Sequence, residues 1–186
     1  MELLWHAAAF ILSRRPIADW LIRRAQHTPY FNLAGYMDRD WLFNGYSSDQ
    51  SLPPGERSRT KRWPRLPSIR VHHILREDLA DHPHDHPWNA RTIILLGSYI
   101  ECRWYRASAS WFRLRHVRQP GDTARIRFGD FHHIEQVSEG GVWTLFVTFN
   151  YCGDWGFLVD GVKVNHREYE ARFPARTAAH PEGVNP

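Results

Sequence analysis

The chain has 186 residues, which is enough for one domain with a core and a modest extension. Its hydrophobic content of 42%, with nine Trp and ten Phe, excludes a disordered chain. A formal net charge of +4 gives only a weak field, so scattered solubilising charge explains the basic residues. Two cysteines exclude a disulfide framework, and no apolar stretch reaches the roughly 18 residues of a membrane span. We therefore expect a cytoplasmic protein without a membrane partner.

Residues 1–67 are expected to form an extension that packs on the main domain. Within it, residues 2–12 and 16–27 are predicted to be two short helices, and Pro16 suits the first turn of the second. Residues 28–46 are rich in aromatic side chains but have no clear period. We expect this segment to be irregular and to wrap the core.

Residues 47–67 are predicted to form a surface loop, because they are polar, proline-rich and without periodicity. The basic run 57–65 within this loop contains Trp63. Basic side chains beside an aromatic ring could contact the phosphates and bases of a nucleic acid. A solvated loop is the commoner explanation of such a run.

From residue 68 onward the pattern changes to short strands separated by turns. The expected strands are 68–75, 90–96, 99–105, 110–117, 124–128, 132–137, 142–150 and 155–163, the last interrupted by a turn at Asp160 and Gly161. Many short strands without intervening helices favour an all-β sandwich or barrel. We expect this β domain over residues 68–165 and a flexible tail over residues 166–186.

Three histidines alternate within five residues of the chain, at His82, His84 and His86. In an extended segment they would point to one face, because side chains alternate along a strand. Two imidazoles on one face can bind a single metal ion, and neutral imidazoles suit Fe, Zn, Ni, Mn or Cu. The sequence therefore predicts a metal site at the entry to the strand 90–96.

Two stretches of the β region together resemble the paired motifs of the cupin family. The positions that match are His84, His86, Gly97, Pro120, Gly121, Gly129 and His132. The spacing is kept throughout, but Asp78, Ala90, Arg127 and Gln136 stand where the family has Gly, Glu, Pro and Asn. The resemblance covers about residues 68–165. It implies a double-stranded β-helix, or jelly-roll, barrel with a metal ion held by His84, His86 and His132.

The HDHPW stretch at residues 84–88 also resembles uncharacterised cupin-like proteins of bacteria and their phages. That resemblance brings no activity with it, and a phage origin would place the protein in the host cytoplasm. The ligand set alone resembles that of thiol dioxygenases, the cysteine-dioxygenase-like cupins, which implies Fe(II), with Zn, Ni or Mn as alternatives. Because Ala90 cannot coordinate, the site keeps the full charge of a divalent ion, which favours an anionic ligand.

Several neighbours of the histidines are further candidates. Asp85 and Asp130 could orient the ring N–H groups. His82 is an alternative ligand because it shares the face of His84, although it lies outside the matched spacing. His133 should point away from His132, and a register slip of one residue would exchange the two. Arg70 would clamp a substrate carboxylate or phosphate if its strand face points inward, and is otherwise a surface arginine. The other candidates for the wall of a substrate pocket are His72, Thr92, Gln136, Trp88 and Tyr99. Arg91 is expected to face outward.

Three functional hypotheses follow. The first is a three-His Fe(II) oxygenase that acts on a small anionic substrate. The second is a metal-dependent isomerase, epimerase or lyase, in which the ion serves as a Lewis acid. The third is a bacterial or phage accessory protein that uses the barrel as a binding or structural scaffold. A homodimer is compatible with each of the three.

Overall fold

The structure is a computed structural model that describes residues 1–29, 32–46, 62–63, 66–108 and 110–174. The basic run 57–65 lies outside the described residues except for Arg62 and Trp63, so its expected contact with nucleic acid stays a prediction. The end of the expected tail, residues 175–186, lies outside them as well.

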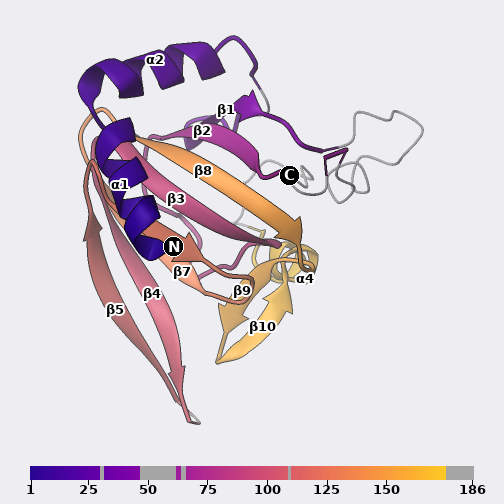
Figure 1. The fold of residues 1–186 in the computed structure, drawn as a ribbon. Coiled ribbons are helices and arrows are strands. Elements are labelled where there is room, and N and C mark those ends of the chain that lie inside the picture. Colours follow the sequence, from indigo (N-terminus) through magenta and orange to yellow (C-terminus); the bar gives the residue numbers. More distant parts are fainter. Residues whose placement is uncertain (30–31, 47–61, 64–65, 109, 175–186) are drawn as a thin grey trace.

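Antiparallel strands are the main secondary structure of the described chain, as expected of an all-β protein (Figure 1). The strands are β1 (Met37–Phe43), β2 (Ser68–Ile74), β3 (Trp88–Leu96), β4 (Tyr99–Ala107), β5 (Ser110–Arg118), β6 (Thr123–Ile126), β7 (His132–Val137), β8 (Val142–Tyr151), β9 (Gly156–Val159) and β10 (Val162–Asn165). The helices are α1 (Glu2–Leu12), α2 (Arg15–Ala25) and α4 (His166–Arg172). The strands form sheets in the orders β1-β2-β8-β3-β6, β5-β4-β7 and β10-β9.

A hydrophobic core lies between the five-stranded and the three-stranded sheets. Ile74, Ile94 and Val142 of the larger sheet pack there against Tyr99 and Ile134 of the smaller one. Because side chains alternate along a strand, the other face of the larger sheet carries a second apolar set, which must be covered from outside.

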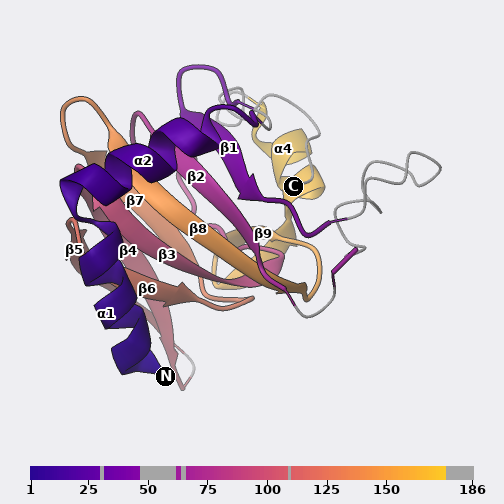
Figure 2. The same ribbon diagram turned by 45° about the horizontal axis from the view of Figure 1, so that its top comes forward.

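The N-terminal helices cover that outer face (Figures 1 and 2). The buried residues of this second core are Ala9, Ala18, Leu21, Ile22 and Ala25 from the helices, and Val71, Ile93, Leu95, Leu145 and Val147 from the sheet. Small side chains at Ala9, Ala18 and Ala25 allow the helices to approach the strands closely. The prediction of two N-terminal helices is confirmed.

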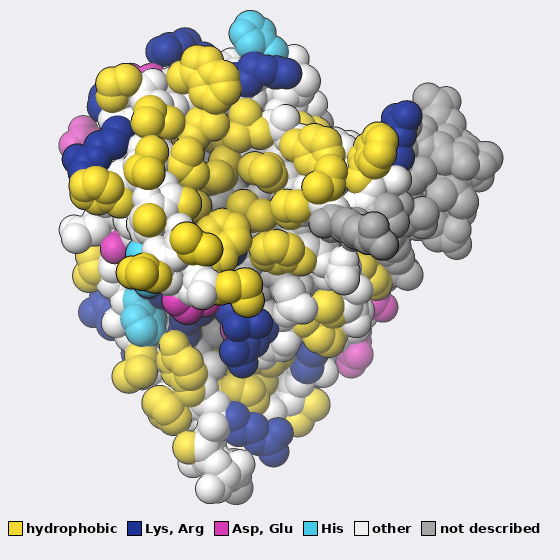
Figure 3. All heavy atoms as spheres, in the orientation of Figure 1, with side chains coloured by type: hydrophobic (Ala, Val, Ile, Leu, Met, Phe, Trp, Pro, Cys, Tyr) yellow, Lys and Arg dark blue, Asp and Glu magenta, His cyan; other side chains and the backbone are white. Residues whose placement is uncertain are grey.

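The opposite side of α1 presents large apolar side chains to solvent, among them Leu3, Leu4, Phe10 and Ile11. Figure 3 shows hydrophobic side chains gathered over the upper part of this view, where α1, α2 and β8 lie in Figure 1. None of the described helices has the length and the apolar character that crossing a membrane would require.

Two segments differ from the sequence-based expectation. The irregular segment expected over residues 28–46 contains the strand β1, which is difficult to recognise because Asp38, Arg39 and Asp40 interrupt its apolar pattern. It forms because it completes the edge of the larger sheet, in register with β2. The tail expected from residue 166 begins with the helix α4, whose N-cap residue Asn165 accepts a hydrogen bond from the backbone N–H of Arg167.

Arg91 lies on the outer face of the larger sheet, as expected, but it is only 4% exposed in its side chain. It donates two hydrogen bonds of 2.7 Å to the carboxylate of Glu2 at the start of α1. The ring of Trp5 lies 5.0 Å from its guanidinium carbon. The first turn of α1 therefore supplies a carboxylate that neutralises Arg91, whose charge would otherwise be buried without a partner on an apolar face.

Replacing Leu95 by Ala should lower the free energy of unfolding by about 2–5 kcal/mol, because it leaves a cavity between the sheet and the helices. Leu95 is 0% exposed, whereas Leu4 on the outer side of α1 is 72% exposed. The matched variant Leu4→Ala should change stability by less than about 0.5 kcal/mol. Urea denaturation of both variants measures the difference, and equal losses would contradict this placement of the helices.

Candidate metal centre

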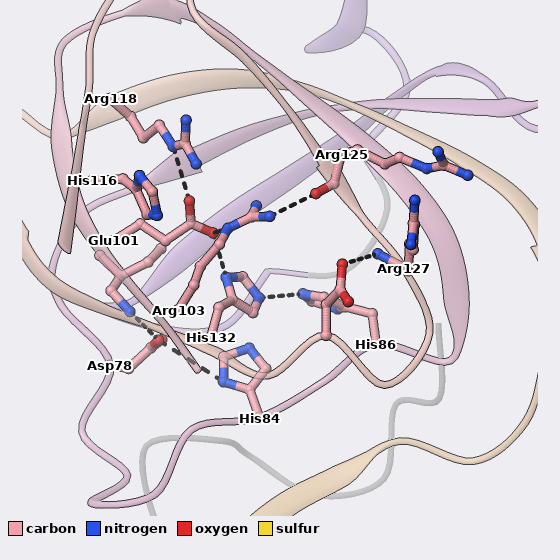
Figure 4. A network of polar contacts seen from close by, with 12 residues as sticks. Asp78, His84, His86, Glu101, Arg103, His116, Arg118, Arg125, Arg127 and His132 are labelled. Atoms are coloured by element: carbon pink, nitrogen blue, oxygen red, sulfur yellow. Dashed lines mark hydrogen bonds and ion pairs between the residues drawn. The ribbon is translucent and has the colours of Figure 1, made fainter. Parts of the chain in front are cut away.

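The three histidines of the cupin-like motifs lie together on neighbouring segments (Figure 4). His84 and His86 belong to the segment before β3, and His132 begins β7. The ring centres of His84 and His132 lie 4.8 Å apart, those of His86 and His132 5.0 Å apart, and those of His84 and His86 5.3 Å apart. One ligand nitrogen from each ring falls within 4.8 Å of the other two.

The distance between one nitrogen of His86 and one of His132 fits a shared metal ion. The Nε2 atoms of His86 and His132 are 2.9 Å apart. Two ligands that lie about 2.1 Å from an ion and about 90° apart are separated by about 3.0 Å. Within the described residues, this trio is the one group of His, Cys, Asp or Glu side chains close enough to hold an ion. His84, His86 and His132 could therefore act as three ligands on one side of a metal ion.

A buried glutamate that the sequence-based prediction missed orients His132. Its Oε1 atom lies 3.0 Å from Nδ1 of His132, and ion pairs of 2.9 Å join Glu101 to Arg103 and to Arg118 (Figure 4). Burial raises the pKa of Glu101, but the hydrogen bond and charge of His132 and the two guanidinium groups outweigh burial, so the pKa falls well below its usual range. Glu101 is therefore a carboxylate that accepts the Nδ1–H of His132 and leaves Nε2 for the ion.

A second carboxylate stands beside His84. The Nδ1 atom of His84 lies 3.9 Å from Oδ2 of Asp78, which accepts a hydrogen bond of 2.7 Å from the backbone N–H of Ile134. The hydroxyl of Tyr36 donates to the other oxygen of Asp78. Burial raises the pKa of Asp78, but His84 and these hydrogen bonds together lower it, so the group is charged at neutral pH. The sequence carried a signal for this role, since Asp78 stands where the cupin motif has glycine.

The two aspartates expected to orient the histidines do not contact them. Asp85 lies between His84 and His86 in the chain, so it points to the opposite side, as alternation requires. Its carboxylate accepts hydrogen bonds from the backbone of Gly129 and Gly156 and pairs with Lys163 at 2.6 Å. The carboxylate of Asp130 accepts a hydrogen bond from the backbone of Arg127, within a turn. Both expectations are corrected: these residues hold the backbone around the site.

His82 and His133, the alternative ligands, also lie outside the trio. The Nδ1 atom of His82 lies 2.9 Å from the hydroxyl of Tyr169 in α4, and its ring packs on Phe173. His82 therefore anchors α4. His133 follows His132 on β7 and does not line the cavity, because successive side chains on a strand point to opposite faces.

A cavity of about 230 Å³ opens beside the three histidines, between the two larger sheets. Five of the six predicted pocket residues line it: Arg70, His72, Trp88, Thr92 and Tyr99. The cavity is also lined by the apolar side chains of Phe146, Ile126 and Ile134 and by residues of α4. Arg70 therefore faces inward to the cavity and is not a surface arginine.

Gln136 is the predicted pocket residue that does not line the cavity. The strand pairing shifts in register between Ile100 and Glu101, so that Gln136 lies opposite Ile100 and Val137 lies opposite Tyr99. This bulge reverses the alternation of β7 beyond Ile134. Gln136 consequently points to solvent, whereas Val137 packs on the inner core.

Comparison with known proteins supports the fold. No protein-family model matches the chain, and no curated protein sequence matches it. Among solved structures, it is similar to vicilin from hazelnut (Corylus avellana), with a TM-score of 0.52 and 12% identity over 81% of this chain and 39% of vicilin. Hydroxypropylphosphonic acid epoxidase from S. wedmorenis gives a TM-score of 0.44 and 15% identity over 67% of this chain and 56% of the epoxidase. The capsular polysaccharide assembling protein CapF from Staphylococcus aureus gives a TM-score of 0.44 and 11% identity over 66% of this chain and 28% of CapF.

The chain thus spans well under two thirds of each of these three proteins. Identities of this size show the fold alone. The protein has a cupin-type, all-β fold with antiparallel sheets and N-terminal helices, and it carries three histidines that could hold a metal ion. The predicted fold class is confirmed.

Replacing Glu101 by Gln should weaken the affinity for Zn²⁺ or Fe(II) by about 10- to 100-fold, because the neutral amide is a weaker acceptor for the Nδ1–H of His132 and holds the ring less firmly. Glu135 pairs with Arg115 at the surface of the same sheet and does not touch the trio, so Glu135→Gln is the matched control. Competition titration with a chelating dye measures the affinity, and circular dichroism checks the fold. Equal affinities in the two variants would show that Glu101 does not orient a ligand.

Proposed function

We propose that this chain is a metal-dependent enzyme, an Fe(II) oxygenase with three histidine ligands that acts on a small anionic substrate. The observation that supports this proposal is the convergence of His84, His86 and His132 at one end of a cavity that has both apolar and charged walls. Imidazole is a ligand that suits iron, and a trio on one side leaves the opposite positions open towards the cavity.

The position where a cupin motif has glutamate supplies no ligand. Ala90 is buried in a small apolar cluster with Ile126 and Phe146. The ligand set is therefore neutral. The negative charge of Glu101 is balanced by Arg103 and Arg118, so this nearby carboxylate does not offset the charge of a divalent ion. Asp78, charged beside His84, supplies one negative charge, so a divalent ion would still keep a net positive charge. An anionic substrate supplies that balance.

The residues around the trio perform two tasks. Glu101 holds the Nδ1 side of His132 by a hydrogen bond, so its Nε2 side is preorganised before an ion arrives, and Asp78 places a negative charge 3.9 Å from Nδ1 of His84. Apolar side chains such as Ile126 and Phe146 keep water from the space that a substrate would enter. Fe(II) bound there would supply the activation of O2.

Iron content tests the proposal. Protein that is produced in cells supplied with iron and purified without oxygen should contain about one iron per chain by elemental analysis. The variants His84→Ala and His132→Ala should lose this iron. His133→Ala is the matched control, because this histidine is adjacent in sequence but does not line the cavity. Its iron content should equal that of the unaltered protein.

The chemistry is tested separately by oxygen uptake with a panel of small organic acids. Uptake that depends on both iron and a substrate supports the oxygenase. A stoichiometric metal other than iron, with no oxygen uptake, would favour the isomerase, epimerase or lyase hypothesis. Protein without any bound metal would contradict the proposal and leave the scaffold hypothesis.

A further inference from the structure

A second group of polar side chains faces the same cavity from β1 and β2, strands that carry none of the three histidines. Strand register places Arg39 opposite His72 and Trp41 opposite Arg70. Arg39, Arg70 and His72 all line the cavity. This wall is distinct from the end of the cavity where His84, His86 and His132 meet.

Arg70 is the most deeply buried cation of this wall, at 2% exposure. Its guanidinium carbon lies 4.4 Å from the ring centre of Trp41 and 5.0 Å from that of Trp88. The two indole rings hold the guanidinium group in place by cation–π contact. Arg39, 9% exposed, adds a second positive charge to the same wall.

Two buried nitrogens on this wall lack a hydrogen-bond partner: that of Trp88 needs an acceptor, and that of His72 can donate in one of its two neutral tautomers. Nε2 of His72 and Nε1 of Trp88 are buried and make no hydrogen bond within the described residues. An indole N–H can only donate. Burial and the charges of Arg70 and Arg39 keep the pKa of His72 well below its ordinary value, so its ring is neutral and carries one N–H. Buried donors of this kind are normally satisfied, by water or by a ligand.

We propose that Arg39, Arg70, His72 and Trp88 form a subsite for the carboxylate of a short organic acid with an apolar body. A carboxylate is planar and has two acceptor oxygens. It can accept paired hydrogen bonds from the edge of the Arg70 guanidinium group and single hydrogen bonds from the ring N–H groups of Trp88 and His72. The cavity volume of about 230 Å³ admits only a small acid.

The position of Phe146 connects this subsite with the three histidines. Its ring centre lies 4.9 Å from that of His72 and 5.5 Å from that of His86. An acid whose carboxylate lies at Arg70 would therefore lay its body over Phe146 and bring its far end to the histidines. That last step rests on the proposed function, whereas the carboxylate subsite itself does not need a metal ion.

Calorimetric titration tests the subsite with three probes: butyrate, the neutral isostere butyramide, and inorganic phosphate. Each probe is added to the metal-free protein and to the protein loaded with Zn²⁺, which does not react with O2. Butyrate should bind both forms, and butyramide should bind at least about tenfold more weakly, because it cannot pair with a guanidinium group.

Arg70→Met should weaken butyrate binding by at least about tenfold, and Trp88→Phe by a smaller factor. Arg91→Met is the matched control: it removes an arginine of similar burial from the outer face of the same sheet and should leave binding within about twofold. Thermal unfolding of each variant shows whether it is folded. If Arg70→Met alone does not fold, the comparison of butyrate with butyramide on the unaltered protein decides.

The inference is overturned if the unaltered protein does not bind butyrate, if butyramide binds equally well, or if Arg70→Met binds butyrate unchanged. Phosphate bound in preference to butyrate would also overturn the assignment to a carboxylate. Butyrate binding that needs Zn²⁺ but not Arg70 would place the anion on the metal, and would leave the proposed function standing. Butyrate binding retained in a His84→Ala variant that holds no metal supports the subsite independently of that function.

Discussion

The site depends on how the segment that carries His84 and His86 is held between two strands. Backbone hydrogen bonds of 2.9 Å run in both directions between His84 and His132 of β7. On its other side, the same segment donates from Asp85 to Gly156 and accepts at Pro83 from Leu158, the partners belonging to β9. The segment lies outside any regular strand, yet it is fixed on both sides as a strand would be. This constraint brings together histidines that are far apart in the sequence.

The charges around the cavity are arranged in two separate groups. Behind the histidines, Glu101 and Asp78 are buried carboxylates, and Glu101 is held by Arg103 and Arg118. On the wall made by β1 and β2, the charge is positive, from Arg70 and Arg39. Glu101 would orient a ligand histidine and the arginines would favour an anion. The two groups therefore support the two parts of one proposal, a metal ion at one end of the cavity and an acidic substrate that reaches it.

Pattern and spacing in the sequence were sufficient for the strands of the main domain, the two N-terminal helices and the histidine trio. Alternation also placed Arg70 and His72 on one strand face. Alternation failed at Gln136, because a bulge in β7 adds one residue and reverses the faces beyond it. It failed for β1 because polar residues interrupt its pattern, and this strand forms only where β2 offers an edge.

The sequence by itself determined which residues could bind a metal, since imidazoles at motif spacing are a local property of the chain. The tertiary structure alone decided what surrounds them. Glu101 lies 31 residues from His132 in the chain, and no local pattern links the two. Asp85, adjacent to two of the histidines, points away and holds the backbone instead. Contacts between strands depend on register and packing, which are set by the whole sheet, whereas ligand identity depends only on the side chain.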